Sequence, residues 1–337
     1  MSTPDESFHP PPLPVVEPEP SARRPKKLLP FGIALFVLGL IVAVLGIPKL
    51  GPVIAGGIPT GGIMALGGII LLAFSFIPLP AVPDTEPPLP FFSKLTGIFF
   101  EPSRVFRNLR VHPHWVGAYA VIVVLSVIYT FAFVQRITPE RIVEHTTQKL
   151  AEMGPPFAPP PDRIEAMRET QLRQLKNPVE RVGTVIKSAV GLFILGAFTA
   201  ALCMLGALAF GGRINYWQAL SVVFYYWLPV TAIQKLLGLG ILYLKSPEDL
   251  HPILNQETTL QDNLGILMTP ADHPVLFVLL SFIGLTWFYT LWLRAKGLNL
   301  GATRMGSSAA WGVSITLYVL LLIFVTIWTS LFSSFIT

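Results

Sequence analysis

Seven long apolar runs are the feature of this sequence that most limits what it can fold into. A helix needs about 20 apolar residues to cross the hydrocarbon core of a bilayer, and its backbone must satisfy its own hydrogen bonds there. The sequence therefore predicts an all-α, polytopic transmembrane helix bundle of about seven spans, of which the first two are the shortest. The runs cover residues 31–47, 63–77, 115–134, 182–210, 216–244, 275–293 and 309–336.

The composition favours a membrane protein over a soluble enzyme. Hydrophobic residues make up 52% of the chain and charged residues only 13%, whereas soluble domains carry about 25% charged residues. The sequence has no glycine-rich phosphate loop, no Gly-x-Ser-x-Gly and no His-Glu-x-x-His pattern. No Asp or Glu falls within the apolar runs. We therefore expect a non-enzymatic protein with no catalytic residue, no metal site and no cofactor.

Cysteine and histidine do not change this expectation. Cys203 is the single cysteine, so the chain offers it no disulfide partner. His112 and His114 are close enough in sequence to share a metal ion, but no third ligand lies near them. We interpret them as histidines at the membrane interface.

Basic residues between the runs predict the orientation, because positively charged short loops stay in the cytoplasm. Four cations at 23–27 directly precede the first run, so the N-terminus is expected inside and the C-terminus, after seven spans, outside. We interpret the net charge of +5 in this way and expect no nucleic-acid partner. The first run itself is expected to target the chain, to the inner membrane in a bacterium. The other cations expected inside are Lys94, Arg104, Arg107, Arg110, Arg213, Arg294, Lys296 and Arg304.

Proline-rich stretches divide the chain into parts. Residues 1–30 form a tail of low hydrophobicity that is expected to be disordered, either as a spacer or as a docking ligand for an aromatic groove. Residues 31–79 predict a two-span accessory hairpin and residues 80–90 a linker. Residues 91–337 then hold a five-span membrane domain, which we expect to be the folding unit.

Two segments of that domain are expected outside the spans. Residues 136–181 predict a hairpin of two short helices around a proline-rich breaker, placed on the extracytoplasmic side with Lys49 and the acidic segment 245–272. Residues 91–111 predict a helix lying on the membrane surface, with an apolar face opposite a basic one. That basic face can meet anionic lipid head groups, or the segment can be an ordinary connector helix. Its arginines are Arg104, Arg107 and Arg110.

The fifth run carries the polar residues that lie deepest in the membrane. Pro229 removes a backbone donor and is expected to kink the helix. Gln234 and Lys235 follow, and the nine residues from Lys235 to Leu244 put Lys235 about 13 Å below the outer end of the helix. The Lys235 side chain can snorkel over part of that distance, or it can stay buried and face a cavity or partner.

Several motifs, taken in order, resemble the Yip family of Ypt/Rab-interacting membrane proteins, in particular its prokaryotic members. FEP at 100–102 resembles that family's entry segment, GGRINYWQAL at 211–220 its turn into the third span, and YYWLP at 225–229 the aromatic stretch inside that span. The helical hairpin and GLNLG at 297–301 also fit, so the resemblance covers residues 91–337. From these motifs and the polar residues of the fifth run, the candidate structural or functional residues are Gly211, Gly212, Tyr225, Tyr226, Pro229, Gln234 and Lys235, besides the three arginines.

The resemblance implies a five-helix membrane domain with a cytoplasmic N-terminal side and an outward C-terminus. Eukaryotic members are linked to Rab GTPases, vesicle formation and the shaping of Golgi and endoplasmic reticulum membranes. Those members carry Asp-Leu-Tyr-Gly-Pro before the first domain span, where this chain has His-Pro-His-Trp-Val-Gly at 112–117. This departure argues against Rab binding.

Two functional hypotheses follow. The first is a membrane scaffold or adaptor in membrane organisation or trafficking, which holds membrane lipids and membrane or cytoplasmic protein partners. The second is a transporter or channel whose path runs along the kinked fifth span.

Overall fold

The computed structural model describes residues 28–47, 57–78, 87–152, 159–253, 255–256, 258–269 and 272–331. Most of the proline-rich tail, the loop that contains Lys49, most of the linker at 80–90, the centre of the breaker between the two short helices and the last six residues lie outside the described residues. Expectations about those segments therefore stay predictions.

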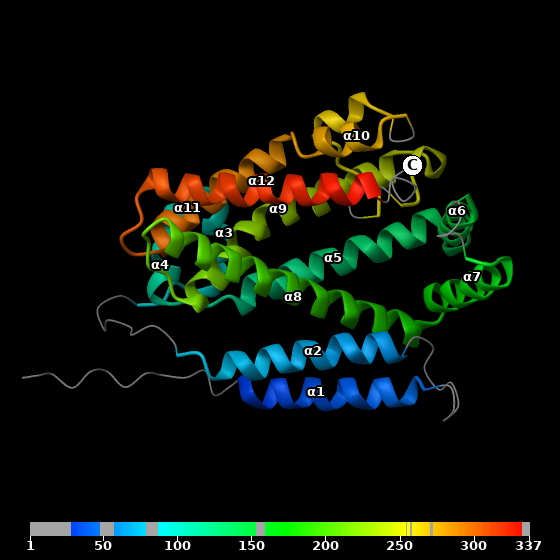
Figure 1. Ribbon diagram of the computed structural model, residues 1–337, viewed down its shortest axis with the longest axis horizontal. Coiled ribbons are helices and arrows are strands. Elements are labelled where there is room, and N and C mark those ends of the chain that lie inside the picture. The colour runs from blue at the N-terminus through cyan, green and yellow to red at the C-terminus, as the bar shows by residue number, and fades with distance from the viewer. Residues whose placement is uncertain are drawn as a thin grey trace, which may run out of the picture.

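The described chain is helical, and six of its helices are long and apolar enough to cross a membrane. They run alongside one another in the direction of the longest axis of the molecule (Figure 1). These helices are α1 (Leu28–Leu45), α2 (Gly57–Ser75), α5 (Val116–Ile137), α8 (Pro178–Ala209), α9 (Tyr216–Leu244) and α12 (Ser307–Leu331). The all-α, polytopic architecture predicted from the sequence is confirmed.

Shorter helices occupy the connections. The two expected between the third and fourth runs are α6 and α7, and two 3₁₀ turns lie in the segment after α9. The bounds are α3 (Phe91–Phe100), α4 (Pro102–Val111), α6 (Pro139–Glu152), α7 (Pro161–Lys176), η2 (Pro247–Asp249), η3 (Leu264–Leu267), α10 (Pro274–Ser281) and α11 (Leu285–Gly301).

The sixth apolar run, expected to be one span, is broken into α10 and α11. At the break Gly284 is extended, with φ −156° and ψ 166°, and it forms an isolated β-bridge with Asn263. Asp262 caps the start of α11 because its carboxylate accepts from the Thr286 N–H at 2.6 Å and its carbonyl accepts from the Leu285 N–H at 3.3 Å. A loop thus takes over the backbone bonds that a continuous helix would make. Neither half is among the helices that are long and apolar enough to cross a membrane.

The segment 91–111, expected to be one helix, is two. The chain leaves the helical region at Glu101, with φ −130° and ψ 55°, between α3 and α4. The following residue is Pro102, and a proline disfavours the α conformation of the residue before it. The hydropathy of the segment alone does not reveal this break.

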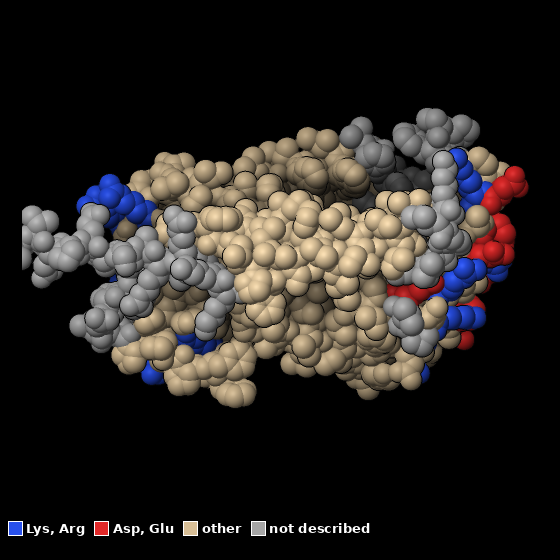
Figure 2. All heavy atoms as spheres, turned by 90° about the horizontal axis from the view of Figure 1, so that it is seen from below, with Lys and Arg blue, Asp and Glu red and all other residues tan. Residues whose placement is uncertain are grey.

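The two ends of the bundle differ in charge. α3, α4 and the connection between α11 and α12 lie at one end, and α6 and α7 lie at the other (Figure 1). In Figure 2 Lys and Arg gather without visible acidic residues at the first end, whereas both signs mix at the second. Because positively charged short loops stay in the cytoplasm, this asymmetry predicts that the first end is cytoplasmic. The orientation itself stays a prediction.

Aromatic side chains hold α2 against the rest of the bundle. The Phe74 ring lies 4.8 Å from the Tyr216 ring and 5.9 Å from the Phe193 ring, measured between centroids. Just beyond α2, the Ile77 carbonyl accepts a hydrogen bond of 3.2 Å from Trp217 Nε1. The predicted accessory hairpin therefore packs against the rest of the bundle through the C-terminal end of α2. The domain boundary at 80–90 stays a prediction.

These contacts allow a test of how far the first hairpin contributes to stability. Phe74→Ala removes a ring that is 8% exposed, whereas Phe76→Ala removes one that is 63% exposed. Because lipid is as apolar as the core, the loss of stability comes from lost packing and not from exposure to water. We expect Phe74→Ala to lower the free energy of unfolding by about 2 kcal/mol. Thermal unfolding in detergent should show a lower midpoint for Phe74→Ala than for Phe76→Ala. Equal midpoints would show that the hairpin is not part of the folding unit.

Candidate functional site

Helix α4 presents the three candidate arginines on an exposed face. Arg104, Arg107 and Arg110 are exposed, and the opposite face of the helix is buried, with Val105, Phe106, Asn108 and Leu109. The amphipathic pattern expected for this segment is confirmed. The Arg104–Glu101 ion pair of 3.4 Å joins two side chains that are each more than half exposed, so it contributes little to stability.

Asn108 fixes α4 to the chain that precedes α3. Its Oδ1 accepts from the Leu89 N–H at 3.2 Å, and its Nδ2 donates to the Pro87 carbonyl at 3.3 Å. These hydrogen bonds lie on the face of α4 opposite the arginines. They hold α4 in place without any contribution from the arginines.

Lys94, one of the cations expected on the cytoplasmic side, is buried. The side chain lies on the buried face of α3, and its Nζ is 3.3 Å from His114 Nδ1. Burial lowers the pKa of Lys94 to about 8, and burial together with the Lys94 charge lowers the pKa of His114. The His-Pro-His segment therefore forms part of a packed connection, and Lys94 does not add to the exposed charge at this end.

Gly211 and Gly212 shape the turn between α8 and α9. Gly211 has φ +80°, a conformation that residues with a Cβ rarely adopt. The turn brings Arg213 against Thr303, with backbone hydrogen bonds of 2.8 Å and 2.7 Å in the two directions. These two glycines are structural, since they join the α8–α9 connection to the α11–α12 connection.

The aromatic stretch of α9 lies in the core. Tyr225 and Tyr226 are fully buried, Pro229 is buried behind them, and α9 runs unbroken through Pro229. The kink expected there stays a prediction. These residues pack the centre of the bundle, so the structure gives them a packing role.

Arg294, expected in a cytoplasmic loop, is a buried cation. It is 8% exposed, because α11 continues for seven residues beyond it to Gly301. One guanidinium nitrogen, Nη2, donates to the Ser314 carbonyl on α12, while Nε has no hydrogen-bond partner among the described residues. The apolar residues on both sides of Arg294 were the signal that could have revealed its burial.

The Lys235 side chain is also buried, at 6% exposed. Its Nζ lies 4.6 Å from the centroid of the Tyr129 ring, a cation–π arrangement. Tyr129 in turn donates from its hydroxyl to the Asn255 carbonyl at 2.7 Å. Beside it, Gln234 Nε2 lies 3.5 Å from Thr286 Oγ1 at the start of α11. Of the polar residues of the fifth run, Gln234 therefore meets α11, and Lys235 meets α5.

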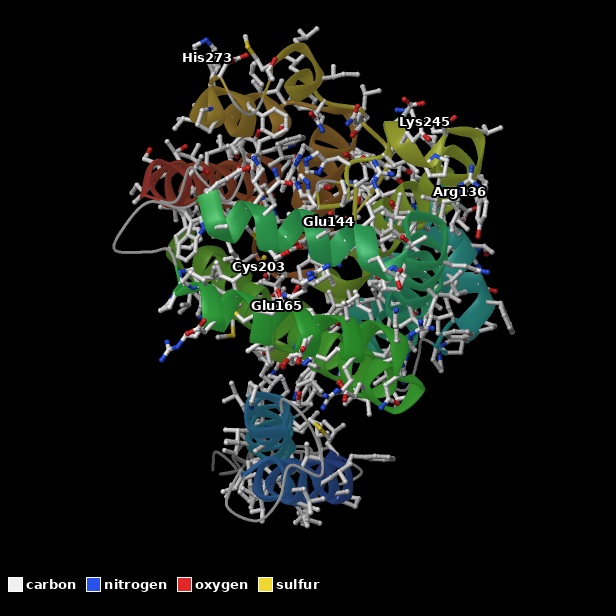
Figure 3. All side chains as sticks on the ribbon, turned by 90° about the vertical axis from the view of Figure 1, so that its right-hand side faces the viewer. Arg136, Glu144, Glu165, Cys203, Lys245 and His273 are labelled. Carbon is white, nitrogen blue, oxygen red and sulfur yellow. The ribbon has the colours of Figure 1, made fainter. Side chains whose placement is uncertain are left out.

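A second site lies at the end that carries α6 and α7. Figure 3 looks onto this end, with Glu144 on α6, Glu165 on α7, and Arg136 and Lys245 beside them. Arg136 donates from Nη2 to the Lys245 carbonyl at 3.1 Å, so the ends of α5 and α9 are tied together. Within this end α6 and the segment 248–252 line an open pocket of about 450 Å³.

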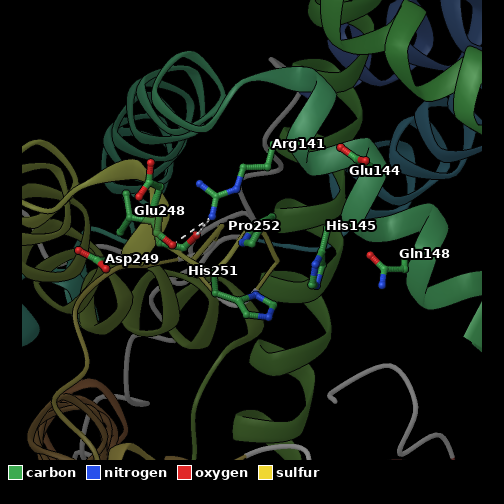
Figure 4. Close-up of a pocket in the computed structure, with 9 residues that line it drawn as sticks. Arg141, Glu144, His145, Gln148, Glu248, Asp249, His251 and Pro252 are labelled. Atoms are coloured by element: carbon green, nitrogen blue, oxygen red, sulfur yellow. Dashed lines mark hydrogen bonds between the residues drawn. The ribbon is translucent and has the colours of Figure 1, made fainter.

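Histidine and arginine side chains line this pocket (Figure 4). Arg141 donates to the carbonyls of Pro247 and Glu248, and the rings of His145 and His251 meet edge to face, with centroids 4.8 Å apart. These histidines lie more than a hundred residues apart and share no motif, so no sequence pattern points to them. No group of three His, Cys, Asp or Glu side chains that could hold a metal ion occurs in the described part of the chain.

Burial lowers the pKa of both histidines, and positive neighbours lower it further. Lys149 and Arg141 act on His145, although Glu152 partly opposes them. His145, Lys149 and Arg141 act on His251. Both rings are therefore neutral at neutral pH, and protonation of either would place a charge against its neighbour.

These shifts give a pH dependence of stability. The folded pKa values lie below the usual value of about 6.5, so the unfolded chain takes up protons first as the pH falls. The stability is present above about pH 6.5 and is lost as the pH falls toward the folded values. The thermal midpoint should fall less on acidification in His145→Gln/His251→Gln than in the wild type, with His273→Gln as the exposed control. An unchanged acid response in the double variant would contradict the assignment.

One comparison with known proteins gives a match. A family model for the Yip1 domain matches residues 96–329, which is more than half of the chain. No relative was found among curated proteins, and none among solved structures. The matched region starts within α3 and ends within α12, so it contains the arginine face, the glycine turn and all of α9. The chain belongs to the Yip1 family.

Proposed function

We propose that this protein is a non-enzymatic membrane scaffold or adaptor in membrane organisation or trafficking. The observation that carries the proposal is the exposed arginine face of α4, held in place by a buried apolar face and by Asn108. A fixed and exposed row of cations is a binding surface rather than a catalytic one. Membership of a family of membrane proteins supports the same class of function.

Charge at this end of the bundle favours a negatively charged partner. Glu101, between α3 and α4, is the only acidic residue within 91–111, 210–215 and 302–306. Each Lys or Arg near an anionic bilayer contributes about 1 kcal/mol of attraction. The partner is therefore an anionic lipid surface, an acidic protein surface, or both at once. The exposed or half-exposed cations are Arg104, Arg107, Arg110, Arg213, Lys296 and Arg304.

The test compares two sets of three arginines. Arg104→Gln/Arg107→Gln/Arg110→Gln removes the α4 face, and Arg163→Gln/Arg168→Gln/Arg173→Gln removes three exposed arginines from α7 at the opposite end. We expect the α4 variant to lose proteins or anionic lipids that co-purify with the wild type from native membranes in mild detergent. The α7 variant should keep them.

Both variants change exposed side chains, so both should fold, which size-exclusion chromatography checks. A full set of partners on the folded α4 variant would contradict the proposal. Retention should also fall as the salt concentration rises, because exposed charges are screened by salt.

A second candidate function is a transporter or channel. The break between α10 and α11 favours it, because non-helical backbone at membrane depth is tolerated where it is buried in protein or lines a water-filled cavity. The Asp262 carboxylate at the start of α11 and Gln234 near Thr286 supply polar groups there.

Flux measurements separate the two functions. For a scaffold, liposomes with the wild-type protein should pass small ions no faster than protein-free liposomes, and Lys235→Met should change nothing. Flux through the wild type that Lys235→Met abolishes, with folding intact, would falsify the scaffold function and favour the transporter.

A further inference from the structure

A cavity of about 270 Å³ lies between α8, α9 and α11. Its volume is just below the range of about 300–1,000 Å³ that is usual for the pockets of drug-sized ligands. The cavity therefore has room for one ring-sized group, and a longer part of the same ligand would have to lie outside it.

The cavity lies near the middle of the bilayer. The 29 residues of α9 span about 43 Å, which matches the thickness of a bilayer including its head groups. Val230, which lines the cavity, is the central residue of this helix, and Trp227 and Gln234 line it on either side. These residues lie within about 6 Å of the midplane along the helix axis. A ligand at this depth is uncharged, because charge is costly at the bilayer centre.

Residues around the cavity face lipid. Leu195, which lines it on the α8 side, is 54% exposed. On α11, Leu285 and Phe288 flank two lining residues and are 77% and 58% exposed. Side chains exposed at this depth meet lipid chains. A ligand would therefore enter sideways from the bilayer and could leave an apolar tail among the lipid chains.

Polar groups of the cavity can donate hydrogen bonds. Gln234 Nε2 carries two N–H groups, and its side-chain partner among the described residues is Thr286 Oγ1 at 3.5 Å. A bond of that length is weak, so the amide can still donate to a ligand. The hydroxyls of Thr231 and Thr286 also line the cavity, whereas the Thr290 hydroxyl already donates to the Thr286 carbonyl at 2.7 Å. The lining therefore suits a ligand that carries hydrogen-bond acceptors.

The protein itself holds these donors in position. Thr286 is fixed at the start of α11, because its N–H donates to the Asp262 carboxylate at 2.6 Å. The backbone carbonyl of Gln234 accepts from Thr258 Oγ1 at 3.4 Å. A site whose groups are already ordered loses less conformational freedom when it binds a ligand.

Two indole rings also line the cavity, Trp227 from α9 and Trp287 from α11. Neighbouring rings hold both of them. The Trp227 centroid lies 5.8 Å from that of Phe224, and the Trp287 centroid lies 4.5 Å from that of Phe282. Indoles are electron-rich and attract flat rings. A flat, electron-poor ring with carbonyl acceptors therefore suits the indoles and the donors together better than an alkyl chain or an alcohol.

We propose that this cavity binds the head group of an isoprenoid quinone. The Gln234 amide and the Thr231 hydroxyl donate to the carbonyl oxygens of the quinone, and the indoles of Trp227 and Trp287 contact its ring. The isoprenoid tail passes Leu195 into the bilayer. Quinones are uncharged and dissolve in the bilayer interior, so they reach this depth. The site is separate from the arginine face and does not rest on the scaffold function.

The test measures binding of decylubiquinone to the full-length protein in detergent micelles. The protein is titrated with the quinone, and native mass spectrometry gives the fraction of protein that carries it. Binding to the wild type should saturate. Gln234→Leu keeps the side-chain volume and removes the amide, so the dissociation constant should rise about fivefold, as for the loss of one neutral hydrogen bond.

Two threonine variants form a matched pair. Thr231→Val replaces a hydroxyl of the lining by a methyl group, and we expect about the same fivefold rise. Thr199→Val makes the same exchange on α8 outside the lining, where the hydroxyl donates to the Leu195 carbonyl at 2.8 Å. Thr199→Val should leave quinone binding unchanged. These exchanges conserve side-chain size, and size-exclusion chromatography checks that each variant folds.

Three results would overturn the proposal. The first is a wild type that does not bind decylubiquinone saturably. The second is a dissociation constant that neither Gln234→Leu nor Thr231→Val raises. The third is equally tight binding of decylbenzene, which has a ring and a chain but no carbonyl group, because such binding would identify an apolar crevice without a role for the donors.

Discussion

The first half of α9 is the element on which the rest of the family domain depends. From Tyr216 to Tyr226 nearly every side chain is buried, and α3, α4, α5, α8 and α11 all pack on this helix. A capping box fixes its start, because Asn215 Oδ1 accepts from the Trp217 N–H and Gln218 Oε1 accepts from the Asn215 N–H. Gln218 also donates from Nε2 to the Arg110 carbonyl at 2.6 Å. The capping residues therefore fix where α9 begins, and Gln218 also holds the end of α4 against it.

The second half of α9 differs because its neighbours are not continuous helices. On one side α10 and α11 meet at an extended residue, and on the other α5 and α8 diverge (Figure 1). Backbone and side-chain polar groups at this depth must be satisfied from within the protein. The segment 255–263 supplies these bonds from its backbone and from Asp262, and Thr259 Oγ1 adds a bond of 2.6 Å to the Gly238 carbonyl. The loop after α9 is thus part of the membrane domain.

The features that hydropathy and helix periodicity determine can be predicted from this sequence. The long apolar runs, the amphipathic face of α4 and the two short helices between the third and fourth runs follow from residue type and spacing. The break in the sixth run did not follow, because Gly284 is extended only through a bridge to Asn263, twenty-one residues earlier in the chain. The burial of Arg294 does not follow from its charge either, because it depends on the packing of α11 against α12. The histidine pocket joins α6 to the segment after α9, so only the tertiary fold brings it together.

Three buried cations show how the protein accommodates charge without carboxylates in its apolar runs. Lys94 lies against His114 near the interface, where its pKa falls. Arg294 donates to a backbone carbonyl that α12 provides. Lys235 lies over an aromatic ring beside a cavity. Histidine, carbonyl and ring are neutral partners, and neutral partners reduce the cost of a buried charge without cancelling it. Each of these contacts joins residues at least twenty positions apart in the chain, so tertiary packing and not the local sequence sets the surroundings of each buried charge.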